Sequence, residues 1–484
     1  MIRASFSCSA TPSSYSDRSP IHNSARTPAH HCGWIVVHLQ RPRLPPGRAV
    51  AFRPGDWDNL WILWPPVRIS ISAPVRRDVL MKFSPMGLSI EKGALLLLIA
   101  AVVAMLTRRL RLPYSVGLVA AGIVLALLPF SPQVSLTKEL LFTGLLPPLI
   151  FEAAFYLNWR QLRRDLPVVL LLATLGVVLS AGVTAAGMHY IAHWHWFSAL
   201  IFGVLIAATD PVSVIATFKE ARAHGRLLLL VESESLFNDG TAAVLFAIVL
   251  EFALGRAPTP LDASFRLIVT VGGSLLCGAL VAGLALLLAG RANDHLVEIT
   301  VTTVAAYGSF LLAEHFHLSG VLATLTAGLM MGNIGPLGAI SDRGREAVQA
   351  FWEYAAFVAN SLVFLLIGMR EARQNFLLGW PLLAAAILIV AAARAVAVYP
   401  CCALFSRSAL RVGMRHQHVL FWGGLRGALA LALAMALPPE IPQREAVVTA
   451  SFAVVAFSVF VQGLTLAPLL RAFGELPGPR RSEL

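Results

Sequence analysis

Glu232-Ser233-Glu234-Ser235-Leu236-Phe237-Asn238-Asp239-Gly240-Thr241 lies inside a long apolar run that extends from Leu227 to Ala253. The hydrocarbon core of a bilayer is about 30 Å thick and takes about 20 residues of helix to cross, so this run is long enough to span it. A charged side chain at that depth costs about 2.5 to 3.5 kcal/mol, and such residues usually line a watery path or pair with each other. The stretch therefore predicts a membrane helix with a functional polar face.

Helical spacing places these polar residues on two neighbouring faces. Ser235 and Asp239 are four residues apart, as are Glu234 and Asn238, so the members of each pair lie above one another. Their side chains offer oxygen ligands, which suit alkali and alkaline-earth cations, whereas a transition metal favours His or Cys. The pattern indicates a path for a hard cation. For Glu232 alone, a position among the lipid headgroups at a helix end is an equally good interpretation.

The composition is that of a polytopic membrane protein. Apolar residues make up 57% of the 484 residues and charged residues only 13%, with a mean hydropathy of +0.72; soluble domains carry about 25% charged residues. The net charge of +12 does not indicate a nucleic-acid partner, because the Arg residues cluster in short loops between apolar runs. The five Cys residues show no Cys-x-x-Cys spacing, so we expect neither a disulfide nor a zinc site, and no cofactor.

Thirteen apolar runs follow one another after residue 81, and they predict an all-α membrane protein with about thirteen transmembrane helices. The runs are 90–106, 114–130, 138–157, 166–190, 197–217, 227–253, 265–290, 296–314, 319–332, 347–369, 376–405, 417–437 and 444–472. Lys and Arg are far more numerous in the loops after odd-numbered runs than after even-numbered ones. Because positive loops stay inside, the N-terminus is expected outside and the C-terminus in the cytoplasm.

Two of the runs are interrupted. Run five contains Ala208-Thr209-Asp210-Pro211, where the proline removes a backbone donor and should break the helix. Run twelve contains Gly423-Gly424-Leu425-Arg426-Gly427, a glycine cluster around a charge. The breaks are seven runs apart, as expected if runs one to six and eight to thirteen repeat one six-helix unit. Paired broken helices in matching positions of two halves are typical of a transporter's binding site.

Four acidic residues fall well inside the runs, and their charge needs compensation. They are Glu152, Asp210, Glu234 and Asp239. Two arginines that also lie inside runs, Arg394 and Arg426, are the available counter-charges. We expect Arg394 to form a structural ion pair with Glu234, which leaves Asp239 free.

These residues lie in motifs that resemble the sodium/proton exchangers of the electroneutral branch of the cation:proton antiporter superfamily, in particular the bacterial NhaP-like proteins. The motifs occur in the family's order, and the resemblance covers residues 81 to 475. They are Phe151-Glu152-Ala153, Thr209-Asp210-Pro211-Val212, Glu234-Ser235-Leu236-Phe237-Asn238-Asp239-Gly240, Ser361-Leu362-Val363-Phe364-Leu365-Leu366-Ile367-Gly368, Arg394 and Gly423-Gly424-Leu425-Arg426-Gly427.

The resemblance implies two inverted six-helix repeats with broken helices 5 and 12, a homodimer, and a mobile six-helix core domain that carries the ion. It implies that Asp239 and Asp210 bind Na⁺ and that Arg394 bridges to Glu234, with Arg426 as the charge of the second broken helix. Four further residues are expected near the ion: Ser235, Asn238, Thr209 and Glu152.

The predicted function is secondary antiport of Na⁺, with Li⁺ or K⁺ as further candidates, against H⁺. Exchange is expected to be one for one and electroneutral, because the neighbour of Asp239 is the neutral Asn238. Such a protein is not an enzyme; it would serve pH and sodium homeostasis from the lipid of a bacterial plasma (inner) membrane. A K⁺/H⁺ antiporter is the first alternative. An intramembrane aspartyl protease is a remote one, since it expects Gly-x-Gly-Asp, and a channel lacks a filter loop.

The two ends differ from the apolar region. Residues 1 to 80 are rich in Arg and Pro and contain no run long enough to span a membrane. They are interpreted either as disordered or as untranslated, with Met81 as the start; the second reading is preferred. Residues 81–475 form the exchanger domain, and residues 476–484 are expected to be a short cytoplasmic tail.

Overall fold

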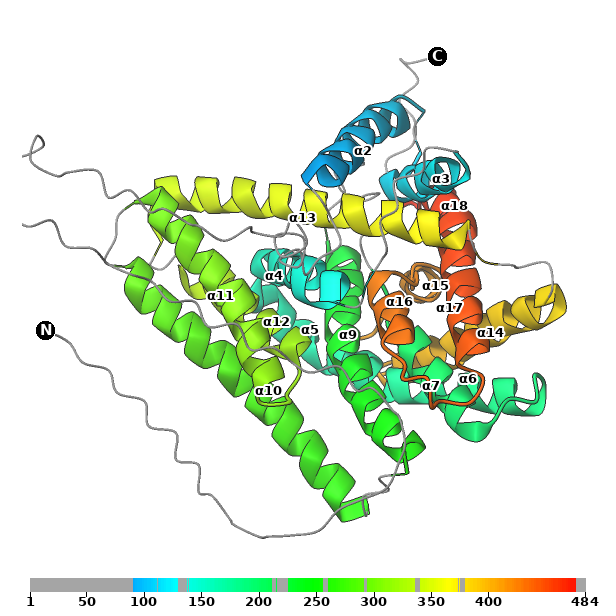
Figure 1. Cartoon of the computed structure of the whole chain (residues 1–484). Helices are drawn as coiled ribbons and strands as arrows, with labels where there is room; N and C mark the ends of the chain where they lie inside the picture. Colours follow the sequence, from blue (N-terminus) through cyan, green and yellow to red (C-terminus); the bar gives the residue numbers. More distant parts are fainter. Residues whose placement is uncertain are drawn as a thin grey trace, which may run out of the picture. The chain divides into compact units, whose positions relative to one another are not determined.

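The computed structural model describes residues 90–110, 112–128, 137, 139–210, 215, 225–255, 260–290, 294–335, 340–372, 374 and 379–475. Within these residues the secondary structure is helical, without strands (Figure 1). Residues 1–80, the start at Met81, Pro211 and the tail 476–484 lie outside the described residues, so the predictions made for them stay predictions.

Each of the thirteen predicted runs contains helix. The elements are α2 (Ile90–Leu110), α3 (Tyr114–Leu127), the π-helical turn η2 (Leu140–Leu145) with α4 (Leu146–Tyr156), α5 (Trp159–Leu171), η3 (Leu172–Gly176) with α6 (Val177–Tyr190), α7 (Trp196–Ala207), α9 (Arg226–Ala253), α10 (Pro260–Ala289), α11 (His295–His315), α12 (Gly320–Ile334), α13 (Asp342–Glu371), α14 (Trp380–Leu404), α15 (Met414–Trp422), α16 (Ala428–Met435), α17 (Arg444–Phe457), η6 (Ser458–Gln462) and α18 (Gly463–Ala472).

The predicted all-α membrane class is confirmed. Among the described residues, eight helical stretches are long and apolar enough to cross a membrane, and α3, η2 with α4, α7 and α12 are shorter apolar helices. Large aliphatic side chains point outward along several of them, as Leu98 on α2, Leu276 on α10 and Leu388 on α14 do. In water such surfaces would be costly, but in a bilayer they face lipid, while the backbone polar groups are satisfied within each helix.

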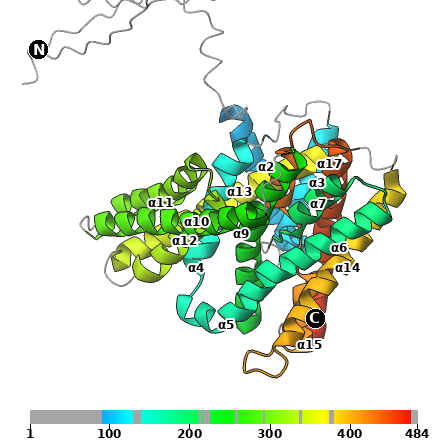
Figure 2. The same ribbon diagram turned by 90° about the horizontal axis from the view of Figure 1, so that it is seen from below.

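The long helix α9 lies between two groups of helices. On one side of it α10, α11 and α12 pack against one another, and on the other side α14 packs against α6 and α17 (Figure 2). The helix α9 contacts α12 of the first group and α6 of the second, and it also contacts α7. The polar stretch of α9 is therefore held in the protein interior, where Glu234, Ser235 and Asn238 are at most 1% exposed.

Small residues allow the helices to approach closely, as is usual where lipid provides no hydrophobic drive between helices. The clearest case is the contact between α3 and α13. Gly122 of α3 lies against the backbone of Leu365 and Gly368, and Gly368 lies against the backbone of Val119. A side chain at either glycine would overlap main-chain atoms, which cannot rotate away.

Replacing Gly368 with Ala should therefore lower the thermal unfolding midpoint in detergent, because the two helices must separate to admit a methyl group. The control is Gly283→Ala in α10, where nothing lies within 4 Å of an added Cβ. Alanine is favoured over glycine in a helix by about 1 kcal/mol, so the control should unfold at the same or a higher temperature. Equal shifts in both variants would contradict close packing at Gly368.

Candidate functional site

Two interruptions of helix meet inside the protein. Helix α7 ends at Ala207, and Ala208, Thr209 and Asp210 continue without helix. Residues 423–427 separate α15 from α16, so the break predicted in run twelve is present. The backbone N–H of Asp210 donates to the carbonyl oxygen of Leu425 at 2.7 Å. The two unwound segments therefore lie directly against each other and satisfy part of each other's backbone.

Arg426 caps the C-terminal end of α7. Its Nη1 donates to the carbonyl oxygens of Ala207 and Ala208, at 3.1 and 3.3 Å, and the residue is only 3% exposed. A helix C-terminus carries unpaired carbonyl groups and a partial negative charge, and the interior of a bilayer offers neither water nor counter-ions to them. The guanidinium supplies both hydrogen-bond donors and positive charge at that point.

The glycines around Arg426 leave room for charged side chains. Gly427 lies against the carboxyl group of Asp210, and Gly424 lies against the guanidinium of Arg394. An added methyl group at either position would overlap those side chains. The glycine cluster thus lets the unwound backbone approach two charged groups closely.

A hydrogen-bonded network joins the end of α7 to the polar face of α9. The hydroxyl groups of Thr209 and Ser235 are 2.9 Å apart. The backbone N–H of Thr209 donates to Oδ1 of Asn238 at 3.2 Å, and Nδ2 of Asn238 donates to the Thr209 hydroxyl at 2.6 Å. The same Nδ2 also donates to Oε1 of Glu234 at 3.1 Å. These four side chains are buried, so the network fixes their positions and their orientation.

The ion pair expected between Arg394 and Glu234 is present. Nη1 of Arg394 donates to Oε1 of Glu234 at 2.8 Å and Nη2 donates to Oε2 at 3.0 Å, the two-pronged geometry that suits a guanidinium and a carboxylate. Nη2 also donates to the carbonyl oxygen of Leu420, in α15, at 2.9 Å. The side chains are 8% and 1% exposed. Glu234 is thus already neutralised by a buried partner.

Asp239 differs from the other polar residues of α9. Its Oδ1 is buried and has no hydrogen-bond partner among the described residues. Asp210, Glu234 and Arg426 are close enough for their charges to act on it. Buried polar atoms are nearly always hydrogen-bonded, and an exception calls for an explanation. A carboxylate oxygen with free lone pairs, placed beside an ordered oxygen-rich network, is a ready ligand for a cation or a proton.

Glu152 lies on α4, which packs against α9. Its charge acts on Tyr156 of the same helix, whose hydroxyl donates to the carbonyl oxygen of Gln349 at 3.3 Å. The structure therefore places Glu152 on a neighbouring helix, and its participation in a cation site stays a prediction.

A buried carboxylate next to two unwound segments of membrane helices is the arrangement of a secondary ion transporter. The family model described as sodium/hydrogen exchanger, transmembrane, matches residues 95–472. The chain belongs to this family of exchangers.

Several known proteins are similar to this chain. It is 37% identical to the Na(+)/H(+) antiporter ApNhaP of Aphanothece halophytica, over 75% of this chain and 70% of that one. It is 33% identical to the Na(+)/H(+) antiporter NhaP of Pseudomonas aeruginosa, over 77% and 96%. The structure of the sodium proton antiporter MjNhaP1 from Methanocaldococcus jannaschii matches with a TM-score of 0.62 at 19% identity, over 80% and 96%. The structural match supports the helical membrane fold.

Replacing Arg394 with Ala should strongly destabilise the protein, because it leaves the Glu234 carboxylate buried without its partner. Breaking a buried pair in this way typically costs about 3 to 5 kcal/mol. Thermal unfolding in detergent measures the effect, and an unshifted midpoint would contradict the role of the pair. The control is Arg266→Ala, which removes the partner of Glu251 from an ion pair whose side chains are 57% and 37% exposed. An exposed pair contributes about 0 to 1 kcal/mol, so this variant should unfold almost as wild type does.

Proposed function

We propose that the chain exchanges Na⁺ for H⁺ across a membrane and that Asp239 is the group that takes either cation. The observation that carries this proposal is the unpartnered Oδ1 of Asp239, buried next to the meeting point of the two unwound segments. Membership of the sodium/hydrogen exchanger family and the names of the relatives support it. Asp210 is the second carboxylate of the site, and the surrounding polar groups are those of Thr209, Ser235, Asn238 and Glu152.

The side chains around Asp239 have distinct tasks in this mechanism. The Asn238 amide and the Thr209 hydroxyl are held by one another, so they form a rigid wall on one side of the ion. Hydroxyl, amide and carboxylate oxygens match the ligand preference of Na⁺. Since Na⁺ and H⁺ need the same carboxylate, binding of one displaces the other. Movement of the site between the two faces of the membrane then converts this competition into exchange.

Replacing Asp239 with Asn should abolish sodium-dependent proton flux in reconstituted vesicles. The amide preserves the size of the side chain, but it can neither exchange a proton nor supply negative charge for Na⁺. The control is Asp342→Asn, the same change at an exposed position in the first turn of α13, which should exchange at the wild-type rate. Substantial flux in the Asp239→Asn vesicles would remove this residue from the mechanism.

The stoichiometry follows from the charges around the site. Arg394 neutralises Glu234, Asn238 is uncharged, and Arg426 stays fixed on the carbonyl groups at the end of α7. If Asp210 remains ionised, Asp239 is the one group that trades a proton for a cation. One Na⁺ then moves for one H⁺, and no net charge crosses the membrane.

A clamped membrane potential should therefore leave the balance between the sodium and pH gradients unchanged. Moving one charge across 100 mV is worth about 2.3 kcal/mol, a bias of more than tenfold, so an electrogenic exchanger would be obvious. The measurement sets the potential with K⁺ and valinomycin in vesicles, after a control shows that the protein does not itself carry K⁺. A balance point that moves with the potential would refute the one-for-one assignment.

The same vesicles distinguish Na⁺ from the other candidate substrates, Li⁺ and K⁺, when each cation is added alone. We further propose that the protein works as a homodimer in a bacterial inner membrane, with the N-terminus outside and the C-terminus in the cytoplasm. In that setting exchange would serve control of internal pH and sodium.

A further inference from the structure

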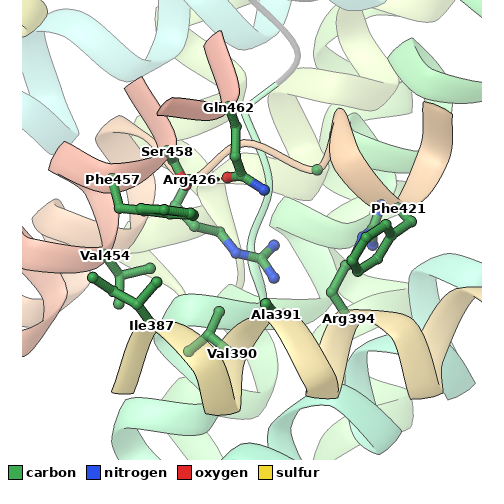
Figure 3. Close-up of a pocket in the computed structure, with 11 residues that line it drawn as sticks. Ile387, Val390, Ala391, Arg394, Phe421, Arg426, Val454, Phe457, Ser458 and Gln462 are labelled. Carbon is green, nitrogen blue, oxygen red and sulfur yellow. Dashed lines mark hydrogen bonds between the residues drawn. The ribbon is translucent and has the colours of Figure 1, made fainter. Parts of the chain in front are cut away.

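A pocket that is partly open to its surroundings lies between α14, the unwound segment after α15, and the junction of α17 with η6 (Figure 3). Its walls are mostly apolar, and they include Ile387, Val390, Phe421, Val454 and Phe457. Its polar lining consists of four side chains: Arg394, Arg426, Ser458 and Gln462. No carboxylate occurs among the described residues that line it. The cavity is therefore distinct from the oxygen-rich surroundings of Asp239.

Both arginines line this cavity, and each has donors without a partner among the described residues. Arg394 spends Nη1 and Nη2 on Glu234 and Leu420, but its Nε is buried and has no partner among the described residues. The Arg394 side chain is more than nine-tenths buried. Arg426 bonds to the end of α7 through Nη1, and within the described part of the chain no bond is recorded for its Nε or Nη2. Neither residue can lose its charge easily, since guanidinium groups stay protonated in proteins.

The amide group of Gln462 adds a further donor. The hydroxyl of Ser458 donates to Oε1 of Gln462 at 2.7 Å, which orients the amide. The amide nitrogen then lies on the side of the Arg426 guanidinium (Figure 3). Two donor groups directed into one pocket can share an acceptor that lies between them. The π-helical turn η6, which carries both Ser458 and Gln462, is of a kind that occurs often at functional sites.

We propose that this cavity binds a small monovalent anion, of which chloride is the simplest. An anion there can accept hydrogen bonds from Arg426 and from the amide of Gln462, beside the positive charge of Arg394. A water molecule is a poorer occupant than an anion, because its own two hydrogens would point toward donors or apolar walls instead of toward acceptors. The apolar walls favour a compact ion that sheds its water readily over a large or strongly hydrated one such as sulfate.

Anion binding should be coupled to the cation site, an effect that rests on the proposed function. A cation on Asp239 adds one positive charge close to Arg426, which also lines the cavity. An anion in the neighbouring cavity is therefore held more strongly when the cation site is loaded than when it is empty. By reciprocity, the anion increases the affinity for the cation.

Thermal unfolding of the purified full chain in detergent tests binding directly. The pH, the sodium concentration and the ionic strength are held constant while chloride replaces the larger anion gluconate. We expect a saturable rise in the unfolding midpoint with chloride. Ala391→Leu, which extends a side chain into the cavity, should abolish the rise. Ala392→Leu makes the same change on the next, exposed residue of α14 and should preserve it.

Gln462→Leu provides a second variant that keeps the test decisive if Ala391→Leu does not fold. It removes one donor at similar volume and should weaken chloride binding by at least about tenfold, as expected for the loss of a hydrogen bond to a charged group. Equal midpoints of wild type in chloride and gluconate would show that the cavity holds water only, and would overturn the proposal. A chloride effect of wild-type size in Ala391→Leu and Gln462→Leu would assign it to the protein surface and overturn the proposal equally.

The coupling is measured in vesicles at high pH, where few protons compete with sodium for Asp239. There chloride should lower the half-saturating sodium concentration about fivefold, the lower end of typical couplings between sites. Unfolding reports anion binding without any transport. If the chain proved not to exchange Na⁺ for H⁺, the dependence of the unfolding midpoint on chloride would still test the anion site. Loss of that midpoint shift with exchange intact would refute the anion site alone.

Discussion

The site depends on how the free carbonyl groups at the end of α7 are satisfied in a place that water does not reach. Unpaired backbone groups cost several kcal/mol each in hydrocarbon, so a broken helix needs donors from elsewhere in the protein. The segment between α15 and α16 supplies these donors through Arg426. In the same segment the carbonyl oxygen of Leu425 accepts a hydrogen bond from the backbone N–H of Asp210. Neither break would be tolerable without the other. The same contact places a fixed positive charge near Asp239, and this charge offsets the repulsion among the acidic residues there.

Compensation of charge distinguishes the structural carboxylate, Glu234, from Asp239, which we propose takes the cation. Glu234 is held by two bonds from Arg394 and one from Asn238, so its lone pairs are largely occupied. Asp239, on the next turn of the same helix, keeps a buried oxygen without a partner. The two residues are chemically similar, so the different roles that we propose for them follow from the groups around them. A buried pair is a poor source of stability in itself, but here it removes a competing ligand and a competing proton acceptor from the site.

The sequence was sufficient for the helices and for part of the site. Apolar length predicted every run, the glycine cluster predicted the break after α15, and helical spacing placed Asn238 next to Glu234, to which it donates. The family resemblance, rather than the spacing, grouped Thr209 with Ser235 and Asn238. The partner of Arg426 could not be predicted, because it is the backbone of Ala207 and Ala208, more than 200 residues away. Every residue has a backbone carbonyl group, so the sequence does not indicate which of them will accept a hydrogen bond. The π-helical turns were missed for a similar reason, since they arise from packing. Gln462, a polar residue inside an apolar run, was a signal for the cavity that the sequence analysis did not use.

The two arginines connect the features that the sequence presents separately. A guanidinium carries five donors in a plane, so it can bind on one edge and still present donors on another, which the single ammonium group of lysine cannot do in the same geometry. Arg394 uses one edge for Glu234 and Leu420, and Arg426 uses Nη1 for the end of α7. Both side chains also line the cavity. An anion bound there, as we propose, would contact the same two arginines that hold Glu234 and the end of α7. Through these arginines the ion pair and the broken helices would connect the proposed anion site with the proposed cation site.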